Sequence, residues 1–327
     1  MKKIISSMIL ALILGTLCFG LVSCGSNEVE YGPYNIGVVY GGETEAAKEA
    51  TVSFITNLQS SIGSDKLTIY ILAETQEMAD ALKNDSGNKD NSKVTVYASA
   101  DLKAGVNDWL ISEEHDLDLI GATTNKAVEA CKVNVKSIPV VANAVAYANE
   151  ERNTSMGSDG SEQIETIKIP SSMGIAPSDV QISYIEELSA NSNKNISFVY
   201  DHANLDSIAQ VNALVKELEV KGYTCSRFDT ASINDAFVND IVYVVEDANT
   251  LAAAEAIKAL NTDIKTVIAS SEALYEACAD TAITINYSMV GTNAADIAFD
   301  ILVNSKTYAQ AKEIADKYVS IARKKSK

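Results

Sequence analysis

The feature that most constrains the fold is an alternation of β-rich runs and helical patterns that occurs twice along the chain. "NIGVVY" from Asn35 and "NISFVY" from Asn195 share one pattern and start 160 positions apart. Each is followed by a polar loop and an amphipathic helix, which reach Leu58 and Leu218, again 160 positions apart. Strands that alternate with helices are typical of α/β domains with parallel sheets. We therefore expect two doubly wound, Rossmann-like lobes with parallel central sheets.

A second internal echo indicates where the two halves differ. "DLIGATTNKAVEA" around Asn125 resembles "DIVYVVEDANTLAAAEAI" around Asn249, and these positions are 124 apart. The first half is therefore longer, and we expect an extra unit with the strand "VTVYAS" between Ala81 and His115. Most of the expected strands are apolar throughout, as in parallel sheets that are covered on both faces.

The domain prediction follows from these patterns. We assign residues 1–23 to a signal peptide, 24–33 to a tether, 34–175 plus 283–327 to lobe 1, and 176–282 to lobe 2. The polar stretch 149–165 is expected to be a long surface loop. "SDVQ" from Ser178 and "TYAQ" from Thr307 have the form of capping boxes, and "KTYAQAKEIADKYVSIARKK" near the end is expected to be helical.

The N-terminus carries an export signal. Lys2 and Lys3 precede an uncharged apolar run that ends in Leu21-Val22-Ser23-Cys24, a match to the lipobox of bacterial lipoproteins. A retained membrane helix is the competing interpretation, because the run is near the length that crosses a bilayer. We expect cleavage before Cys24, lipidation of its thiol, and attachment to the outer face of the cell membrane.

Composition excludes several classes of function. The net charge is −18, which argues against nucleic acid, since its binding requires clustered Lys and Arg. Cys131, Cys225 and Cys278 are expected to be buried free thiols, although one disulfide among them stays open. His115 and His202 do not cluster with other ligands, and no P-loop, GxSxG or HExxH motif occurs. We expect no metal, no cofactor and no enzymatic activity, and a monomeric chain.

The segments that carry a family resemblance are, in order, "IGVVY", "DLIGATTNKAVEA", "IPVVANAVA", "QISYIEEL", "ISFVYD", "IVYVVEDANTLAAAEA" and "TINYSMVGTNAADIAFDIL". Through these segments the chain resembles the ABC-transporter substrate-binding lipoproteins that include tryptophan- and tyrosine-binding members. The resemblance covers roughly residues 35–304. It implies a type I periplasmic-binding-protein fold, in which two α/β lobes are joined by a hinge and bind a ligand in the cleft. The chain departs from the family at Thr44-Glu45, where His-Pro is common, at Ala146-Tyr147-Ala148, in place of "TDP", and at Asn286, in place of an acid.

In open parallel sheets, ligands bind beyond the carboxyl ends of the strands. The loops expected there supply the candidate ligand-binding residues Glu43, Thr44, Thr123, Thr124, Asn125, Tyr147, Ser207, Asp247, Asn249, Ser271, Asn286 and Tyr287.

Individual residues among these candidates have two possible roles. Thr123 and Thr124 precede a helix, where backbone N–H groups attract a carboxylate, or they only cap that helix. Asp247 matches the family's acid after the "IVYVV" strand, so it would pair with an ammonium group, or it caps its loop. Tyr147 and Tyr287 could stack on a flat ligand. Ser207 matches the second residue of a family Asn-Ser pair whose Asn is replaced by Asp206.

The sequence thus predicts a lipid-anchored solute-binding component of an ABC importer. It would capture a small polar solute, with an aromatic amino acid favoured by the resemblance, and present it to a membrane permease after hinge closure. Two alternatives stay open at this point. The same clamp could report a ligand to a receptor partner, or the scaffold could carry an exported enzyme.

Overall fold

The structure, a computed structural model, describes residues 32–111, 116–134, 138–147, 150–156, 162–190, 193–261, 266–305 and 319–323. Residues 33–327 form one unit, and the signal, Cys24 and the "TYAQ" motif lie outside the described residues. Within the described ranges, no helix combines the length and the apolar character that crossing a bilayer requires.

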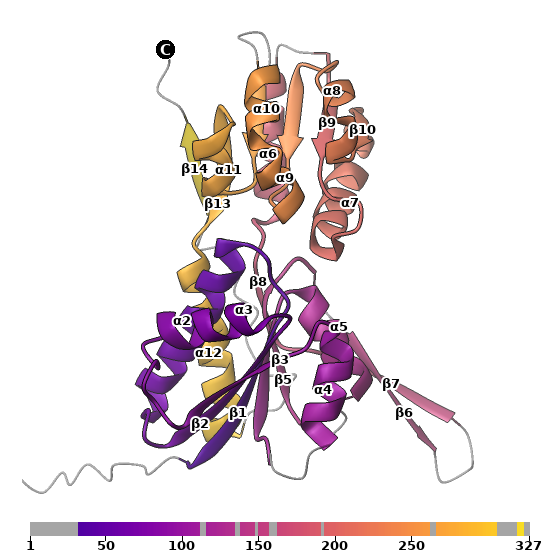
Figure 1. The fold of residues 1–327 in the computed structure, drawn as a ribbon. Helices are drawn as coiled ribbons and strands as arrows, with labels where there is room; N and C mark the ends of the chain where they lie inside the picture. The colour runs from indigo at the N-terminus through magenta and orange to yellow at the C-terminus, as the bar shows by residue number, and fades with distance from the viewer. Residues whose placement is uncertain are drawn as a thin grey trace, which may run out of the picture. The chain divides into compact units, whose positions relative to one another are not determined.

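The first lobe is built on a parallel six-stranded sheet in the order β3-β2-β1-β4-β5-β8. Its strands are β1 (Tyr34–Tyr40), β2 (Leu67–Ala73), β3 (Val94–Ala98), β4 (Leu119–Thr123), β5 (Val140–Val145) and β8 (Ser171–Met173). Its helices are α2 (Glu45–Ile62), α3 (Gln76–Asp85), α4 (Leu102–Ile111), α5 (Asn125–Asn134) and α12 (Tyr287–Asn304). Figure 1 shows α2, α3 and α12 on one face of the sheet and α4 and α5 on the other.

The second lobe repeats this plan with the sheet order β10-β9-β11-β12-β13-β14. Its strands are β9 (Asn195–Val199), β10 (Thr224–Phe228), β11 (Ile241–Val244), β12 (Thr266–Ala269), β13 (Thr281–Ile285) and β14 (Val319–Arg323). Its helices are α6 (Ser178–Ser189), α7 (Leu205–Val220), the 3₁₀ turn η1 (Thr230–Ser232), α8 (Ile233–Ala236), α9 (Ala248–Ala252), α10 (Ala254–Leu260) and α11 (Glu272–Ala277). All neighbouring strands are parallel except β13 and β14.

Both faces of the second sheet are buried along β9, β11, β12 and β13, which explains why these strands are mostly apolar. Along β11, Ile241 and Tyr243 pack with α6 and α7, whereas Val242 and Val244 pack with α8, α10 and α11. Successive side chains of a strand point to opposite faces, so a strand covered on both sides has apolar residues at most of its positions. The predicted fold class, two α/β lobes with parallel sheets, is confirmed.

The expected repeat is visible in the strand orders. β10-β9-β11-β12-β13 follows the same order as β2-β1-β4-β5-β8, with β1 corresponding to β9 and β4 to β11. The strand "VTVYAS" forms β3, which lies at the edge of the first sheet next to β2. This edge strand is the extra unit that the two offsets predicted.

The polar stretch 149–165 was predicted to be a loop, and this prediction was wrong. β6 (Glu150–Met156) and β7 (Glu162–Lys168) form an antiparallel two-stranded sheet whose register runs from Glu150 opposite Lys168 to Met156 opposite Glu162. A polar strand pair lacks the apolar alternation that identifies a half-buried strand, although its backbone groups pair in the same way. β10, with the mixed sequence "TCSRF", gave no signal either.

Two further expectations differ from the structure. α6 begins at Ser178, but its N-cap is Pro177 and no side chain caps it, so "SDVQ" is not a capping box. The Gln181 side chain is used elsewhere, because it donates to the Ala176 carbonyl and accepts from the Tyr243 hydroxyl at 2.5 Å. The segment "VSIAR", expected to be helical, is strand β14, since it extends the second sheet by pairing with β13.

The chain passes between the lobes after β8, after β13, and again between α12 and β14. All of β13, including residues 283–285, and β14 belong to the second sheet, whereas the sequence had assigned residues 283–327 to lobe 1. α12 itself returns to the first lobe, where it packs along α2. At Gly291 a Cβ atom would lie 2.1 Å from the Ala50 carbonyl oxygen, so only glycine permits this approach of the two helices.

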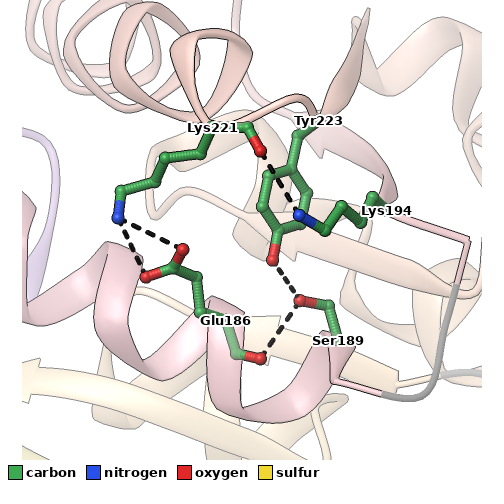
Figure 2. A network of polar contacts seen from close by, with 5 residues as sticks. All are labelled: Glu186, Ser189, Lys194, Lys221 and Tyr223. Carbon is green, nitrogen blue, oxygen red and sulfur yellow. Dashed lines mark hydrogen bonds and ion pairs between the residues drawn. The ribbon is translucent and has the colours of Figure 1, made fainter.

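A polar network fixes α6 against the end of α7 in the second lobe (Figure 2). Lys221 Nζ lies 3.1 Å from both carboxylate oxygens of Glu186, and the hydroxyls of Ser189 and Tyr223 are hydrogen-bonded. Lys194 Nζ donates to the Lys221 carbonyl at 3.3 Å and lies 5.0 Å from the centroid of the Tyr223 ring. These contacts connect α6 to the end of α7 and to Lys194, the residue before β9.

Candidate functional site

A cavity of about 420 Å³ lies beyond the carboxyl ends of strands from both sheets. Its walls include the loop after β1, the start of α5, the loop after β5, the turn before α7, the loop after β11 and the first residue of α12. The cavity is therefore where open parallel sheets place their ligands.

The loop after β1 brings Gly41, Gly42, Glu43 and Thr44 to the cavity. Thr44 is the N-cap of α2, and its Oγ1 accepts a hydrogen bond from the Ala47 N–H at 3.2 Å. The loop therefore has a fixed end, because the cap satisfies one of the free N–H groups of the first turn.

The polar residues between β4 and α5 have different surroundings. Thr123 is buried, with Oγ1 2.9 Å from Thr51 Oγ1 and 3.1 Å from Asn143 Nδ2. Thr124 lines the cavity, has a φ of 76°, and its buried hydroxyl has no hydrogen-bond partner in the described part of the chain. A left-handed backbone is strained for a β-branched residue, and such strain concentrates at functional sites.

Asp206, in the first turn of α7, reaches the backbone of the first lobe. Its Oδ1 accepts from the N–H of Asn125, the first residue of α5, at 3.3 Å and from the N–H of Ala146 at 3.3 Å. The Ala146 N–H is shared, since it also donates to Asn125 Oδ1 at 2.7 Å. Burial raises the pKa of Asp206 to about 6, and the two N–H groups act in the opposite direction.

Asp247 is buried, and its carboxylate makes contacts in its own loop and in the turn before α7. It is the N-cap of α9 in a capping box, where Oδ1 accepts from the Thr250 N–H at 2.7 Å. Its Oδ2 accepts from the Asp201 N–H at 2.8 Å and from the Ser207 hydroxyl at 3.1 Å. The carboxylate thus joins the turn before α7 to the loop after β11.

Glu246 lines the cavity beside Asp247. Burial raises the pKa of its carboxyl group, the charge of Asp247 raises it further, and hydrogen bonds from the hydroxyls of Ser271 and Thr44 lower it. Burial also raises the pKa of Tyr287, with further contributions from the charges of Glu246 and Asp206 among others. Both groups therefore lie in buried surroundings next to other acidic side chains.

The structure brings five of the predicted residues together at the cavity. These are Glu43, Thr44, Thr124, Ser207 and Tyr287.

The remaining candidates lie near the cavity but not among its described lining residues, and most have structural partners. Asn249 donates from Nδ2 to Asp201 at 2.8 Å, Ser271 caps α11 and Asn286 caps α12. Asn125 Nδ2 donates to the carbonyl of the half-buried Tyr147 at 3.3 Å. The predicted residues that are not among the described lining residues are Thr123, Asn125, Tyr147, Asp247, Asn249, Ser271 and Asn286.

Four charged lining residues were not among the candidates: Lys126, Asp201, Asp206 and Glu246. All of them belong to or adjoin the predicted loops, so their position along the strands was a usable signal. Among the described residues, no group of three or more His, Cys, Asp or Glu side chains could hold a metal ion. Cys131, Cys225 and Cys278 form no disulfide in the part of the chain that the structure describes, and Cys131 and Cys278 are buried.

No protein-family model matches the chain, and no curated protein matches it. Solved structures do. A conserved domain protein from Vibrio cholerae is 14% identical with a TM-score of 0.63, over 89% of this chain and 92% of that one. An ABC domain from Streptococcus pneumoniae in complex with L-Trp is 15% identical with a TM-score of 0.58, over 86% and 88%.

A third match is the ligand-free, open structure of a substrate binding protein with adhesive properties from Clostridium difficile, at 19% identity and a TM-score of 0.56, over 88% of this chain and 91% of that one. LacI-type regulators are found among the similar structures too. Identities this low show the fold alone. That fold is the type I periplasmic-binding-protein fold, as the resemblance implied.

Proposed function

We propose that the chain is a lipid-anchored extracytoplasmic binding protein that captures a small polar solute for an ABC importer. The observation that carries the proposal is the cavity of about 420 Å³ at the carboxyl ends of both parallel sheets. Its volume is in the range of small-molecule sites. Thr44 and Thr124 come from the first lobe, and Asp206 and Glu246 from the second, so a bound solute would contact both.

The proposed mechanism is population shift. A solute that touches both lobes stabilises the arrangement in which those groups converge, and no covalent step is needed. The lipid on Cys24 would keep the protein at the membrane, where a permease receives the solute. The resemblance makes amino acids, aromatic ones included, the first class to examine.

A thermal-shift screen of the full-length chain in non-ionic detergent tests the proposal. The compounds are amino acids, amines, purines, nucleosides and sugars. A ligand at 100 times its dissociation constant stabilises a protein by about 2.7 kcal/mol, which corresponds to a rise of several degrees in the melting temperature. We expect at least one compound to give such a shift, and a screen without any shift contradicts solute binding.

A further inference from the structure

The charges that face the cavity are unbalanced. Four carboxylates line it, from Glu43, Asp201, Asp206 and Glu246. Among the described lining residues, the one cationic side chain is Lys126, and its Nζ lies 2.7 Å from Glu74 Oε1. A ligand in the cavity therefore meets a negative potential, since the positive charge of Lys126 is already paired.

The place that would suit a ligand carboxylate is already taken. The N-terminus of a helix attracts anions, because its free N–H groups and its dipole both favour negative charge. At the ten-residue helix α5 that position holds Asp206, whose Oδ1 accepts from the N–H groups of Asn125 and Ala146. An incoming carboxylate would have to displace Asp206 and would be repelled by Glu246.

Two groups in the cavity are suited to a hydrogen-bond donor instead. Thr124 is only 8% exposed, and its hydroxyl has no partner among the described residues, although buried polar groups are normally paired. Glu246 carries a half-buried carboxylate next to the buried Asp247. It accepts hydrogen bonds from the uncharged hydroxyls of Ser271 and Thr44, and no cationic side chain among the described residues pairs with it. A buried negative charge is stabilised by a cation at hydrogen-bonding distance.

We infer that the cavity takes a small organic amine without a carboxylate, with Glu246 as its counter-charge and the Thr124 hydroxyl as a second polar contact. This inference rests on the proposed function and narrows the class of solute. Asp206 serves as an internal carboxylate that occupies the α5 N-terminus. The ammonium group of an amine is attracted by Glu246, and an amine has no carboxylate that needs the N-terminus of α5. An amino acid has the same attraction to Glu246, but its carboxylate finds the N-terminus of α5 occupied by Asp206.

Isothermal titration calorimetry with pairs that differ only by a carboxylate tests the inference. The probes are tyramine and tyrosine, tryptamine and tryptophan, agmatine and arginine, and putrescine and ornithine, each titrated into the full-length chain in non-ionic detergent. We expect at least one amine to bind at least about tenfold more tightly than its amino acid, a difference of about 1.4 kcal/mol.

Variants connect the preference to the named residues. Glu246→Gln keeps the shape but removes the charge, and it should weaken amine binding at least about tenfold, because hydrogen bonds to ionised groups are the strong ones. Glu186→Gln is the matched control, since it removes an equal charge from the ion pair with Lys221 outside the cavity, and it should leave binding unchanged. Asp206→Ala should free the Asn125 N–H for a ligand carboxylate, whereas the Ala146 N–H keeps Asn125 Oδ1 as its acceptor. We expect the ratio of amine affinity to amino acid affinity to fall at least about tenfold in this variant.

The outcomes separate this inference from the proposed function. Amino acids that bind as tightly as their amines would overturn the inference, while solute binding would stand. If a sugar or nucleoside bound and no amine did, the inference of an amine ligand would again be overturned, while solute binding would stand. If no probe of any class bound, both proposals would fall. Circular dichroism of each variant establishes that it is folded, and the comparison of probes on the unaltered chain needs no variant.

Discussion

Thr123 and Thr124 are neighbours between β4 and α5, yet their hydroxyl groups have opposite energetic roles. Thr123 Oγ1 has two polar neighbours, at 2.9 and 3.1 Å, whereas Thr124 Oγ1 is buried without a partner among the described residues. A buried polar group without a hydrogen-bond partner destabilises the folded state. Removal of a buried polar group that has partners also destabilises the folded state, because those partners lose a hydrogen bond. The Thr124 hydroxyl is therefore an energetically unfavourable group at the wall of the cavity.

Valine substitution at these two positions should change stability in opposite directions. Thr124→Val removes the unpaired hydroxyl and keeps the β-branched shape, so we expect the free energy of unfolding to rise by about 1 kcal/mol. Thr123→Val should lower it by about 1–3 kcal/mol, because Asn143 and Thr51 lose a partner. Urea denaturation measures both, and destabilisation by Thr124→Val would show that its hydroxyl is satisfied.

Asp206 should make stability depend on pH. Its pKa is raised from 3.8 to about 6 because it is buried, so the charged form is disfavoured in the folded state. Its contribution to stability is fully present below pH 3.8 and is lost as the pH rises through about 6. Asp206→Asn keeps an oxygen acceptor and has no charge to gain. The free energy of unfolding of this variant, relative to that of the unaltered chain, should therefore increase as the pH is raised from 4 to 7. Urea denaturation at pH 4 and pH 7 measures this difference. An equal difference in unfolding free energy at the two pH values would contradict a role of Asp206 in the pH dependence.

At the scale of elements, the contact between α2 and α12 decides where the C-terminal part of the chain returns. The Ala50 carbonyl oxygen would lie 2.1 Å, and Ser53 Cβ 2.8 Å, from a Cβ at position 291. Polar pairs flank this approach, with Ser53 and Ser288 hydroxyls 3.1 Å apart and Asn57 Nδ2 donating to Thr292 Oγ1 at 3.0 Å. The two helices can be this close only while position 291 has no side chain.

Gly291→Ala should therefore destabilise the protein, although alanine is the better helix former. We expect a loss of about 1–3 kcal/mol, because the backbones must separate to admit a methyl group. Met289→Ala, at an exposed position of the same helix, should change the free energy of unfolding by less than about 0.5 kcal/mol. Melting curves of the two variants that coincide would mean that α12 does not depend on this contact.

The elements that the sequence predicts are those whose side chains meet a core. The sequence predicts β1, β4, β5, β9 and β11, because most of their positions are apolar, and the structure buries most of these positions. β6, β7 and β10 were not foreseen, because backbone pairing leaves no mark on a polar or mixed sequence. β14 was misread as helix, since a five-residue strand at a sheet edge is defined by its partner β13 rather than by its own pattern.

The site was predictable to the level of loops and not of side chains. Strand ends are fixed by topology, so the loops after β1, β4, β9 and β11 were expected at one place, and they are found there. Which residue of a loop faces the cavity depends on capping. Asp247 is taken up by the first turn of α9, whereas its neighbour Glu246 faces the cavity. No pattern in the sequence separates these two acids.

At the scale of the whole molecule, the proposed function requires that a solute binds in the cavity that both sheets border. Substitution with a bulky residue at its wall tests this without knowledge of the ligand's chemistry. Ala203 lines the cavity in the turn before α7 and is exposed, so a larger side chain can be placed there without disturbing a core. Ala256, exposed on α10, is the matched control because it is not among the described lining residues.

The most direct measurement is the thermal shift that the best compound of the screen induces in Ala203→Trp and in Ala256→Trp. We expect Ala203→Trp to lose the shift, because the indole occupies the space of the ligand, and Ala256→Trp to keep it in full. A shift that survives in Ala203→Trp at the same ligand concentration, with both variants folded, would mean that the solute binds elsewhere and would contradict the account.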